Sequence, residues 1–268
     1  MEPHAEFEEL RRDAESWWYI TRRKLLREAA LQAVHGKRET RVLDLGCTAQ
    51  LEFEDAAFRA CNVQSSLKTL AFRQIEGDTN LVCSRIEELS LASNSFDAIV
   101  AGDVLQSVAD DLAALREMRR VLKDGGLLCL TVPAYSFLWG EDDEARGHQR
   151  RYTTSELRRK LNNCGFHIQR ATYFVATSFL PLIVGRAAKD IFHKSITQPR
   201  HYPHPSRFAN GAMSAVLDAE RHLMHYVNLP FGTRVVCWAV KPALATEAVL
   251  LPAWERQWAR RPLAQGGV

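Results

Sequence analysis

Short apolar runs alternate with amphipathic segments along most of this chain, and this alternation restricts the fold more than any other feature. The amphipathic segment 110–122 carries one apolar stripe with helical spacing, and Asp110 and Asp111 suit the positive end of such a helix. The apolar runs are nearly continuous and have the length of strands; they are residues 41–45, 96–101, 127–132 and 233–240. Strands that are apolar on both faces are typical of a parallel sheet covered on each side by helices, so the pattern predicts an α/β fold.

Weaker patterns predict the remaining elements. Residues 153–156 (TTSE) form a capping box, which predicts a helix that begins there and ends near Gly165. Residues 195–207 are rich in Pro and His and are typical of a linker. Further helices are predicted over residues 6–33, 65–74 and 209–227, and further strands over residues 58–63, 81–84 and 166–174.

The composition limits the class of protein. The chain has 268 residues, of which 46% are hydrophobic and 25% charged, so it can bury a large core and is not disordered. Its net charge of +3, without a recognisable binding module, predicts no nucleic-acid partner. The six scattered cysteines predict free thiols in a reducing cytoplasm, and the acidic first ten residues do not resemble a secretory signal. His222 and His225 lie one turn apart but lack Cys or carboxylate support, so we expect no metal site.

The turn after the first strand is the first candidate for ligand binding. It covers residues 44–50 (DLGCTAQ), and in a sheet of this type such a turn presents backbone amides to a ligand. Three later stretches accompany it: residues 94–100 (NSFDAIV), 111–126 (DLAALREMRRVLKDGG) and 127–133 (LLCLTVP). Together these motifs resemble the class I S-adenosylmethionine-dependent methyltransferases, and the resemblance extends over residues 17–242.

The resemblance implies an architecture and a division of the chain. The fold would be α/β, Rossmann-like and doubly wound, with a mostly parallel seven-stranded sheet whose last strand is antiparallel. We expect four parts: an N-terminal lid helix (1–38), a Rossmann-like domain (39–176 and 229–242), a helical cap insertion (177–228) and a peripheral tail (243–268).

A second set of motifs resembles one bacterial subgroup of this family. The set comprises residues 17–19 (WWY), 137–139 (FLW), Asp143, 147–148 (GH) and 150–152 (RRY). The resemblance implies acceptor-side roles for Trp139, Arg150, Arg151 and Tyr152. His148 is the candidate general base because imidazole titrates near neutral pH, and Asp143 would orient it.

Simpler interpretations of these motifs stay open. The segment 143–152 could instead be a salt-bridged loop that braces the domain, and residues 17–19 could anchor a helix to the sheet rather than cover a ligand. The run of cations at residues 150–160 could hold a phosphate-bearing acceptor or form a solvated helix face.

On the cofactor side, the resemblance assigns S-adenosylmethionine binding to Asp44, Gly46, Cys47, Thr48, Asn62, Arg85, Ile86 and Asp103. Several of these positions depart from the family pattern. Thr48 and Gln50 replace two of three glycines, where a side chain obstructs the approach of a ligand to the backbone. Asn62 replaces the acidic residue expected at the ribose, and Arg85 replaces an aspartate expected at the adenine. Each lost acceptor costs roughly 1.5–3 kcal/mol, which predicts weakened cofactor binding.

Two functions are therefore compatible with the sequence. The first is methyl transfer to a small or lipid-linked acceptor; the second is a catalytically impaired scaffold or ligand sensor, suggested by the departures just described. The segment 171–189 is uncharged up to Arg186, which suits peripheral membrane contact, although a buried strand leading into a cap helix is the simpler explanation. The expected location is cytoplasmic, with or without membrane association.

Overall fold

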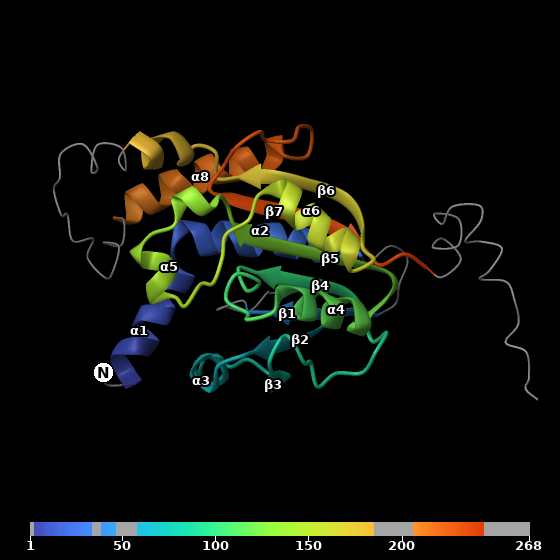
Figure 1. Cartoon of the computed structure of the whole chain (residues 1–268). Coiled ribbons are helices and arrows are strands. Elements are labelled where there is room, and N and C mark those ends of the chain that lie inside the picture. Colours follow the sequence, from blue (N-terminus) through green and yellow to red (C-terminus); the bar gives the residue numbers. More distant parts are fainter. Residues whose placement is uncertain (1–2, 34–38, 47–57, 185–205, 244–268) are drawn as a thin grey trace, which may run out of the picture.

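A seven-stranded sheet forms the centre of the molecule (Figure 1). It is seen in a computed structural model that describes residues 3–33, 39–46, 58–184 and 206–243. The strand order is β3-β2-β1-β4-β5-β7-β6, and β7 runs antiparallel to both of its neighbours while the β1–β5 pairings are parallel. The strands are β1 (Thr40–Leu45), β2 (Phe58–Gln64), β3 (Leu81–Cys83), β4 (Phe96–Gly102), β5 (Leu122–Pro133), β6 (His167–Phe174) and β7 (Arg234–Val240). The predicted mostly parallel sheet with an antiparallel last strand is confirmed.

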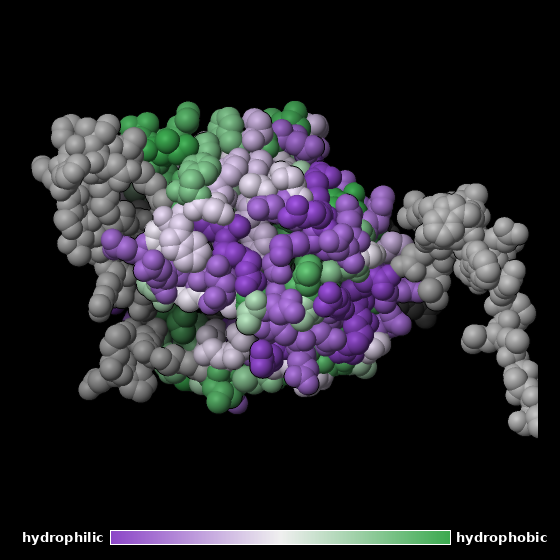
Figure 2. Space-filling model, in the orientation of Figure 1, coloured by the Kyte–Doolittle hydropathy of each residue, from purple (hydrophilic) through white to green (hydrophobic). Residues whose placement is uncertain are grey.

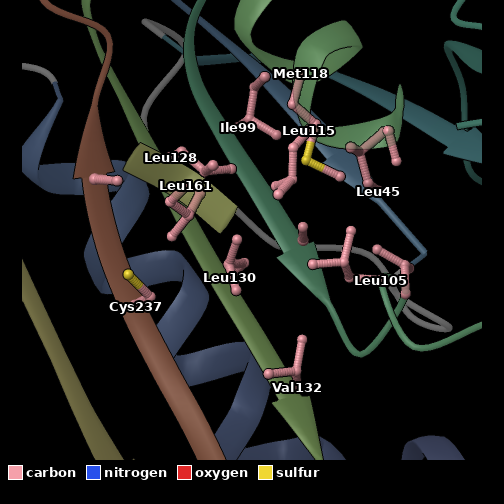
Figure 3. Packing of buried hydrophobic residues seen from close by; sticks show 14 of the residues in the cluster. Leu45, Ile99, Leu105, Leu115, Met118, Leu128, Leu130, Val132, Leu161 and Cys237 are labelled. Atoms are coloured by element: carbon pink, nitrogen blue, oxygen red, sulfur yellow. The ribbon is translucent and has the colours of Figure 1, made fainter. Parts of the chain in front are cut away.

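Helices cover both faces of this sheet. One face packs against α4 (Asp111–Val121) and α6 (Thr154–Asn163), and the opposite face packs against α2 (Trp17–Gln32) and α8 (Arg207–Leu223). Figure 3 shows the first of these cores, where Leu115 and Met118 of α4 meet the side chains of the central strands. The described chain also contains α1 (Pro3–Ala14), α3 (Leu67–Ile75), the short 3-10 helix η1 (Ser136–Leu138) and α5 (Glu141–Ala145).

The N-terminal segment differs from the single helix predicted over residues 6–33. The structure has two helices, because Ser16 adopts an extended backbone between them. Asn210 of α8 stabilises this break: its Oδ1 accepts a hydrogen bond from the Trp17 amide (2.7 Å), and its Nδ2 donates to the Glu15 carbonyl (3.0 Å). The contact joins residues almost two hundred positions apart, so local periodicity could not reveal it.

The helix starts predicted from capping residues are confirmed. Asp110 accepts hydrogen bonds from the amides of Leu112 and Ala113 at the start of α4. Thr153 and Glu156 form the reciprocal capping box of α6. The last helix and strand are shorter than predicted, since α8 ends at Leu223 and β7 begins at Arg234.

Within the described ranges, no helix combines the length and the apolar character that crossing a bilayer requires.

Candidate functional site

A cavity of about 520 Å³ lies at the carboxyl ends of the parallel strands β1, β2, β4 and β5. This edge is where open α/β sheets bind their ligands, and the volume is that of a site for a nucleotide-sized molecule. Its wall contains residues at or just beyond the ends of those strands and of β3, together with residues of α2. It also contains residues from the segment 142–151 that follows β5, and the first residue of β7. Segments far apart in the sequence therefore meet around one space.

Gly46 forms the end of β1 in this wall. Its φ of +75° lies in the left-handed region, and a Cβ added there would lie 1.9 Å from Cγ1 of Val104. Glycine is therefore required by both conformation and space. Asp44, two residues earlier, is fully buried in β1 and does not line the cavity. The predicted positions Cys47 and Thr48, together with Gln50, lie outside the described residues.

The expectation for Asn62 is corrected by the structure. Asn62 pairs with Asp44 inside the sheet, is 1% exposed and does not line the cavity. Gln64, which ends β2, lines the cavity instead, together with the following Ser65. β2 ends at Gln64, so Asn62 lies two residues before the strand end and inside the sheet, whereas Gln64 reaches the cavity.

Arg85 and Ile86 both line the cavity, but in different ways. Ile86 is buried and provides an apolar wall. The Arg85 side chain is 72% exposed, and its guanidinium lies 3.7 Å from the carboxylate of Glu87, which also lines the cavity. The cation that was expected to obstruct the adenine position thus lies at the solvent-exposed rim, next to a carboxylate.

Asp103 follows β4 in a left-handed conformation (φ 53°) and lies in the cavity wall. Its carboxylate accepts hydrogen bonds from Trp18 Nε1 (3.1 Å), Arg22 (3.1 Å) and Thr131 Oγ1 (3.0 Å). Burial by itself raises the pKa of Asp103, but Arg234, Arg22 and these hydrogen bonds outweigh it and hold the pKa below its usual value. Asp103 therefore binds α2 to the sheet.

Trp18 both anchors α2 and lines the cavity. Its ring is buried and lies 6.1 Å from the ring of Phe174, so it anchors α2 to the sheet. It also lines the cavity, as does Tyr19.

Arg234 begins β7 and enters the cavity wall from the far end of the sequence. Its guanidinium lies 3.6 Å from Asp103 and 5.0 Å from the centre of the Trp18 ring. Burial lowers the pKa of Arg234, and the nearby Arg151 and Arg22 lower it further, while Asp103 opposes them. Arg22, Arg151 and Arg234 thus lie close to two carboxylates, Asp103 and Asp143, which leaves the cavity wall with an excess of positive charge.

His148, Asp143 and Arg151 form one connected group on the opposite wall. Asp143 is 1% exposed, and its Oδ1 lies 2.8 Å from His148 Nδ1. Arg151 donates to both carboxylate oxygens, from Nε at 3.0 and 3.1 Å and from a terminal nitrogen at 2.8 Å, and the Gly140 amide adds a bond of 2.8 Å. Burial raises the pKa of Asp143, but the bonds from His148 and Arg151 more than reverse this, and the pKa falls well below its usual value. The carboxylate is therefore ionised.

Gln106 joins this group to the centre of the cavity. The residue is 1% exposed; its Nε2 donates to the Asp103 carbonyl (2.7 Å) and lies 3.4 Å from His148 Nε2. Among the described residues, no group donates to its buried Oε1. Gln106 lines the cavity, while this oxygen itself is enclosed by the protein.

Three of the four predicted acceptor-side residues lie away from the cavity. Arg150 donates to the carbonyls of Val108 (2.9 Å) and Ala109 (2.8 Å). Tyr152 is buried, and its hydroxyl donates to Asp111 (2.9 Å), which with burial raises the tyrosine pKa. Trp139 contacts Glu144 outside the cavity, with 3.4 Å between its Nε1 and the carboxylate. These three residues brace the loop, and Arg151 alone of the four lines the cavity.

Several cavity residues were missed by the sequence analysis: Arg22, Gln64, Gln106, Arg146 and Arg234. Arg22 follows Trp18 by one helical turn, so the two side chains share a face of α2, and this spacing was a usable signal. Arg234 gave no local signal, because its place depends on β7 lying between β5 and β6. Among the described residues, no group of His, Cys, Asp or Glu side chains has the arrangement of a metal site.

Comparison with known proteins agrees with this architecture. Residues 43–130 match a family described as a methyltransferase domain. The chain is 29% identical over 119 residues to a ubiquinone biosynthesis O-methyltransferase of Parvibaculum lavamentivorans, covering 40% of this chain and 47% of that protein. It is 30% identical over 129 residues to a demethylmenaquinone methyltransferase of Staphylococcus haemolyticus, covering 42% and 54%. The aligned stretch thus spans about half the length of these curated relatives.

A solved structure extends the likeness over most of the chain. The [4+2]-cyclase SpnF superimposes with a TM-score of 0.53 and 21% identity, covering 82% of this chain and 80% of that one. Likeness at this identity shows the fold alone. The strand order, the cavity at the carboxyl edge and the match over residues 43–130 agree with one another. Residues 43–130 are therefore similar to a methyltransferase domain, and the fold and the cavity agree with that similarity.

Proposed function

We propose that the protein transfers a methyl group from S-adenosylmethionine to a small or lipid-linked acceptor, and that the 520 Å³ cavity is where this occurs. One observation carries the proposal: the strand-end residues on the cofactor side and the His148–Asp143 pair line the same cavity. Methyl transfer needs both molecules held in one space with the reacting atoms aligned, and this arrangement supplies that space.

The residues present fit the cofactor. Gly46 follows β1 in the cavity wall, Gln64 and Ser65 provide hydrogen-bonding groups at the end of β2, and Ile86 provides an apolar wall for a base. These are the residues that would hold S-adenosylmethionine.

The chemistry requires little from the protein beyond position and a base. S-adenosylmethionine supplies a methyl group on a positively charged sulfur, which makes the methyl carbon electrophilic. His148 would take the proton from an acceptor hydroxyl or acidic carbon. Because the Asp143 carboxylate lies at Nδ1, neutral His148 carries its proton there, and Nε2 is left as the basic atom. Arg151 fixes the carboxylate in place.

The acceptor class comes from the relatives. The two curated relatives described above are named for quinone methylation, and such acceptors join a polar aromatic ring to a lipid tail. A ring hydroxyl or ring carbon of this type would require the base that His148 provides. We therefore propose an acceptor with a hydroxylated ring and an apolar tail.

The test has two stages. Calorimetric titration with S-adenosylhomocysteine should give saturable 1:1 binding, and a Gln64→Ala variant should weaken it. Radiolabelled methyl transfer to a lipid extract and to a demethylmenaquinone probe should then identify product in the organic phase. Failure of the pure protein to bind S-adenosylhomocysteine at millimolar concentration would disprove methyl transfer and favour a scaffold.

A further inference from the structure

Five aromatic side chains form a continuous cluster that the methyl-transfer site does not use. We call the cluster of Tyr135, Phe137, Tyr173, Phe179 and Phe231 the aromatic platform. Tyr135 lies at its centre, with ring-centre distances of 4.9 Å to Tyr173, 5.1 Å to Phe137 and 5.5 Å to Phe179. Phe231 extends it, 5.3 Å from Phe179. The rings come from four separate segments of the chain, so the tertiary fold assembles them.

The platform adjoins the candidate site. Tyr135 follows the cavity residue Pro133 by two positions, and Phe231 precedes the cavity residue Arg234 by three. Because β7 is antiparallel to β5, the end of β5 and the start of β7 share one edge of the sheet, which is the edge that holds the cavity. A molecule seated on the platform would thus have direct access to the acceptor side of the cavity.

The backbone beneath the platform is held in unusual conformations. Tyr135 (φ 56°) and the β-branched Val175 (φ 59°) both adopt the left-handed region, which is costly for such residues. The short helix at residues 179–184 is also tied down: the buried Glu220 of α8 accepts a hydrogen bond from the Ala176 amide at 2.7 Å. The surface is therefore built by specific contacts.

Two side chains of the platform and two of the adjoining helix at 179–184 face solvent. Phe137 is 62% and Phe231 37% exposed, and on the helix Leu180 is 60% and Val184 66% exposed. Figure 2 shows hydrophobic residues gathered along the upper left edge of the molecule, over the helix at 179–184 that is gold in Figure 1. A soluble protein rarely leaves so many large apolar side chains together unless the surface has a partner.

The charge of the adjoining sequence indicates the partner. Residues 186–207 contain five Lys or Arg and one Asp, whereas residues 171–185 contain no charge. An apolar, aromatic surface followed by basic sequence is complementary to the interface of a membrane with anionic lipids, where aromatic rings enter the headgroup region and cations contact phosphate.

We infer that the aromatic platform docks the protein on a lipid bilayer and brings the cavity to the membrane surface. This inference deepens the proposed function, since it states where a lipid-linked acceptor would be met, and it rests on that function for its purpose. Binding to a bilayer is nevertheless a separate property, which can be measured without any methyl transfer.

The test is flotation of the full chain with vesicles of phosphatidylcholine and phosphatidylglycerol. A Phe137→Ser/Leu180→Ser/Val184→Ser variant should lose vesicle affinity by at least about tenfold, because the apolar contacts are additive. The matched control is Leu67→Ser/Ile75→Ser, which removes side chains that are 73% and 66% exposed on α3, at the other side of the molecule. The control should bind vesicles like the unmodified protein.

Thermal unfolding and S-adenosylhomocysteine affinity should be unchanged in both variants, because the substituted side chains are exposed and outside the cavity. Single Phe137→Ser provides a milder version if the triple variant unfolds. The inference is overturned if the unmodified protein does not float with vesicles, if the platform variant floats equally well, or if the variant instead dissociates a dimer seen by sedimentation without vesicles. Loss of flotation with intact S-adenosylhomocysteine binding separates this inference from the proposed function.

Discussion

The carboxylate of Asp143 contacts three groups: the ring of His148, the guanidinium of Arg151 and the amide of Gly140. A carboxylate so placed can fix the tautomer of the histidine while the arginine keeps it ionised at any pH where the protein functions. Single substitutions in this group should therefore separate the function of the base from the stability of the loop.

Replacing His148 by Gln should lower the rate of methyl transfer by about 10²–10⁴-fold, because the base is lost while the polar contacts remain. S-adenosylhomocysteine affinity should change little, since His148 lies on the acceptor side. Single-turnover transfer and calorimetry measure the two effects. The exposed His222→Gln is the control and should match the unmodified protein; an active His148→Gln would remove His148 as the base.

Replacing Asp143 by Asn should destabilise the fold by about 3 kcal/mol, because Arg151 is left without its buried partner. The pKa of Asp143 is lower in the folded chain than in the unfolded one, so its contribution is complete above the unfolded pKa near 4 and is lost as the pH falls below it. Urea unfolding should show a constant difference between the two proteins from about pH 5 upward and a shrinking difference below pH 4. A difference that grows toward low pH would contradict this assignment.

Replacing Gly46 by Ala should destabilise the protein by roughly 2–4 kcal/mol, through a left-handed alanine and a collision with Val104. Gly125 is a matched control, since its φ of +74° is nearly the same but nothing lies within 4 Å of an added Cβ. Gly125→Ala should cost about 1 kcal/mol from the backbone alone. Equal losses of unfolding free energy in Gly46→Ala and Gly125→Ala, measured by chemical unfolding, would show that Val104 moves aside freely.

The end of α5 is joined to the two N-terminal helices, α1 and α2, beside the cavity. Arg146, which follows α5, donates to the Tyr19 hydroxyl of α2 (3.0 Å) and to Asp13 of α1 (3.4 Å). Arg146 Nε also donates to Oδ1 of Asp142, which lies within α5, at 3.1 Å. Arg146 and Tyr19 also line the cavity, so this bridge forms part of the cavity wall.

An Arg146→Met variant should keep global stability within about 1 kcal/mol, because the ion pairs are partly exposed. The variant should release S-adenosylhomocysteine a few-fold faster, since α5 is no longer joined to α1 and α2 beside the cavity. Stopped-flow displacement measures the release rate. Arg59→Met, which removes the exposed pair with Glu39 away from the cavity, is the control; identical release rates in both variants would show that the bridge does not gate the site.

For the whole molecule, the described sheet is complete at Val240, and Lys241 closes it with bonds to Asn94 and the Leu122 carbonyl. A chain that stops after Ala243 should therefore keep its unfolding free energy within about 1 kcal/mol and its S-adenosylhomocysteine affinity. This tests the prediction that residues 243–268 are peripheral. A large loss of either property would place part of the tail in the domain.

The sheet and its helices were predictable because their signals are local. Each signal covers only a few neighbouring residues. Examples are an apolar run of strand length, the apolar stripe on residues 110–122, and the capping residues Asp110 and Thr153. The family resemblance then supplied the seven-stranded, mostly parallel sheet with its antiparallel last strand. These features were sufficient for nearly every described element and for the edge of the sheet that holds the cavity.

The details of the site depend on contacts that the sequence does not display. Gln64 rather than Asn62 reaches the cavity because β2 continues two residues beyond Asn62, and only packing decides where a strand ends. Arg150 and Arg151 are neighbours of the same type, yet one binds loop carbonyls and the other binds Asp143 in the cavity wall. Residue type and spacing could not separate them.

The position of β7 has a consequence for how the protein is made. In the described sheet, β6 has β7 as its neighbour, and β7 also brings Arg234 to the site and follows the loop of Phe231. Until β7 has left the ribosome, β6 lacks its described neighbour and the cavity lacks Arg234 in its wall. Ligand capture must therefore wait for β7 to pair, and a product terminated before β7 would expose an unpaired strand edge to quality-control proteases.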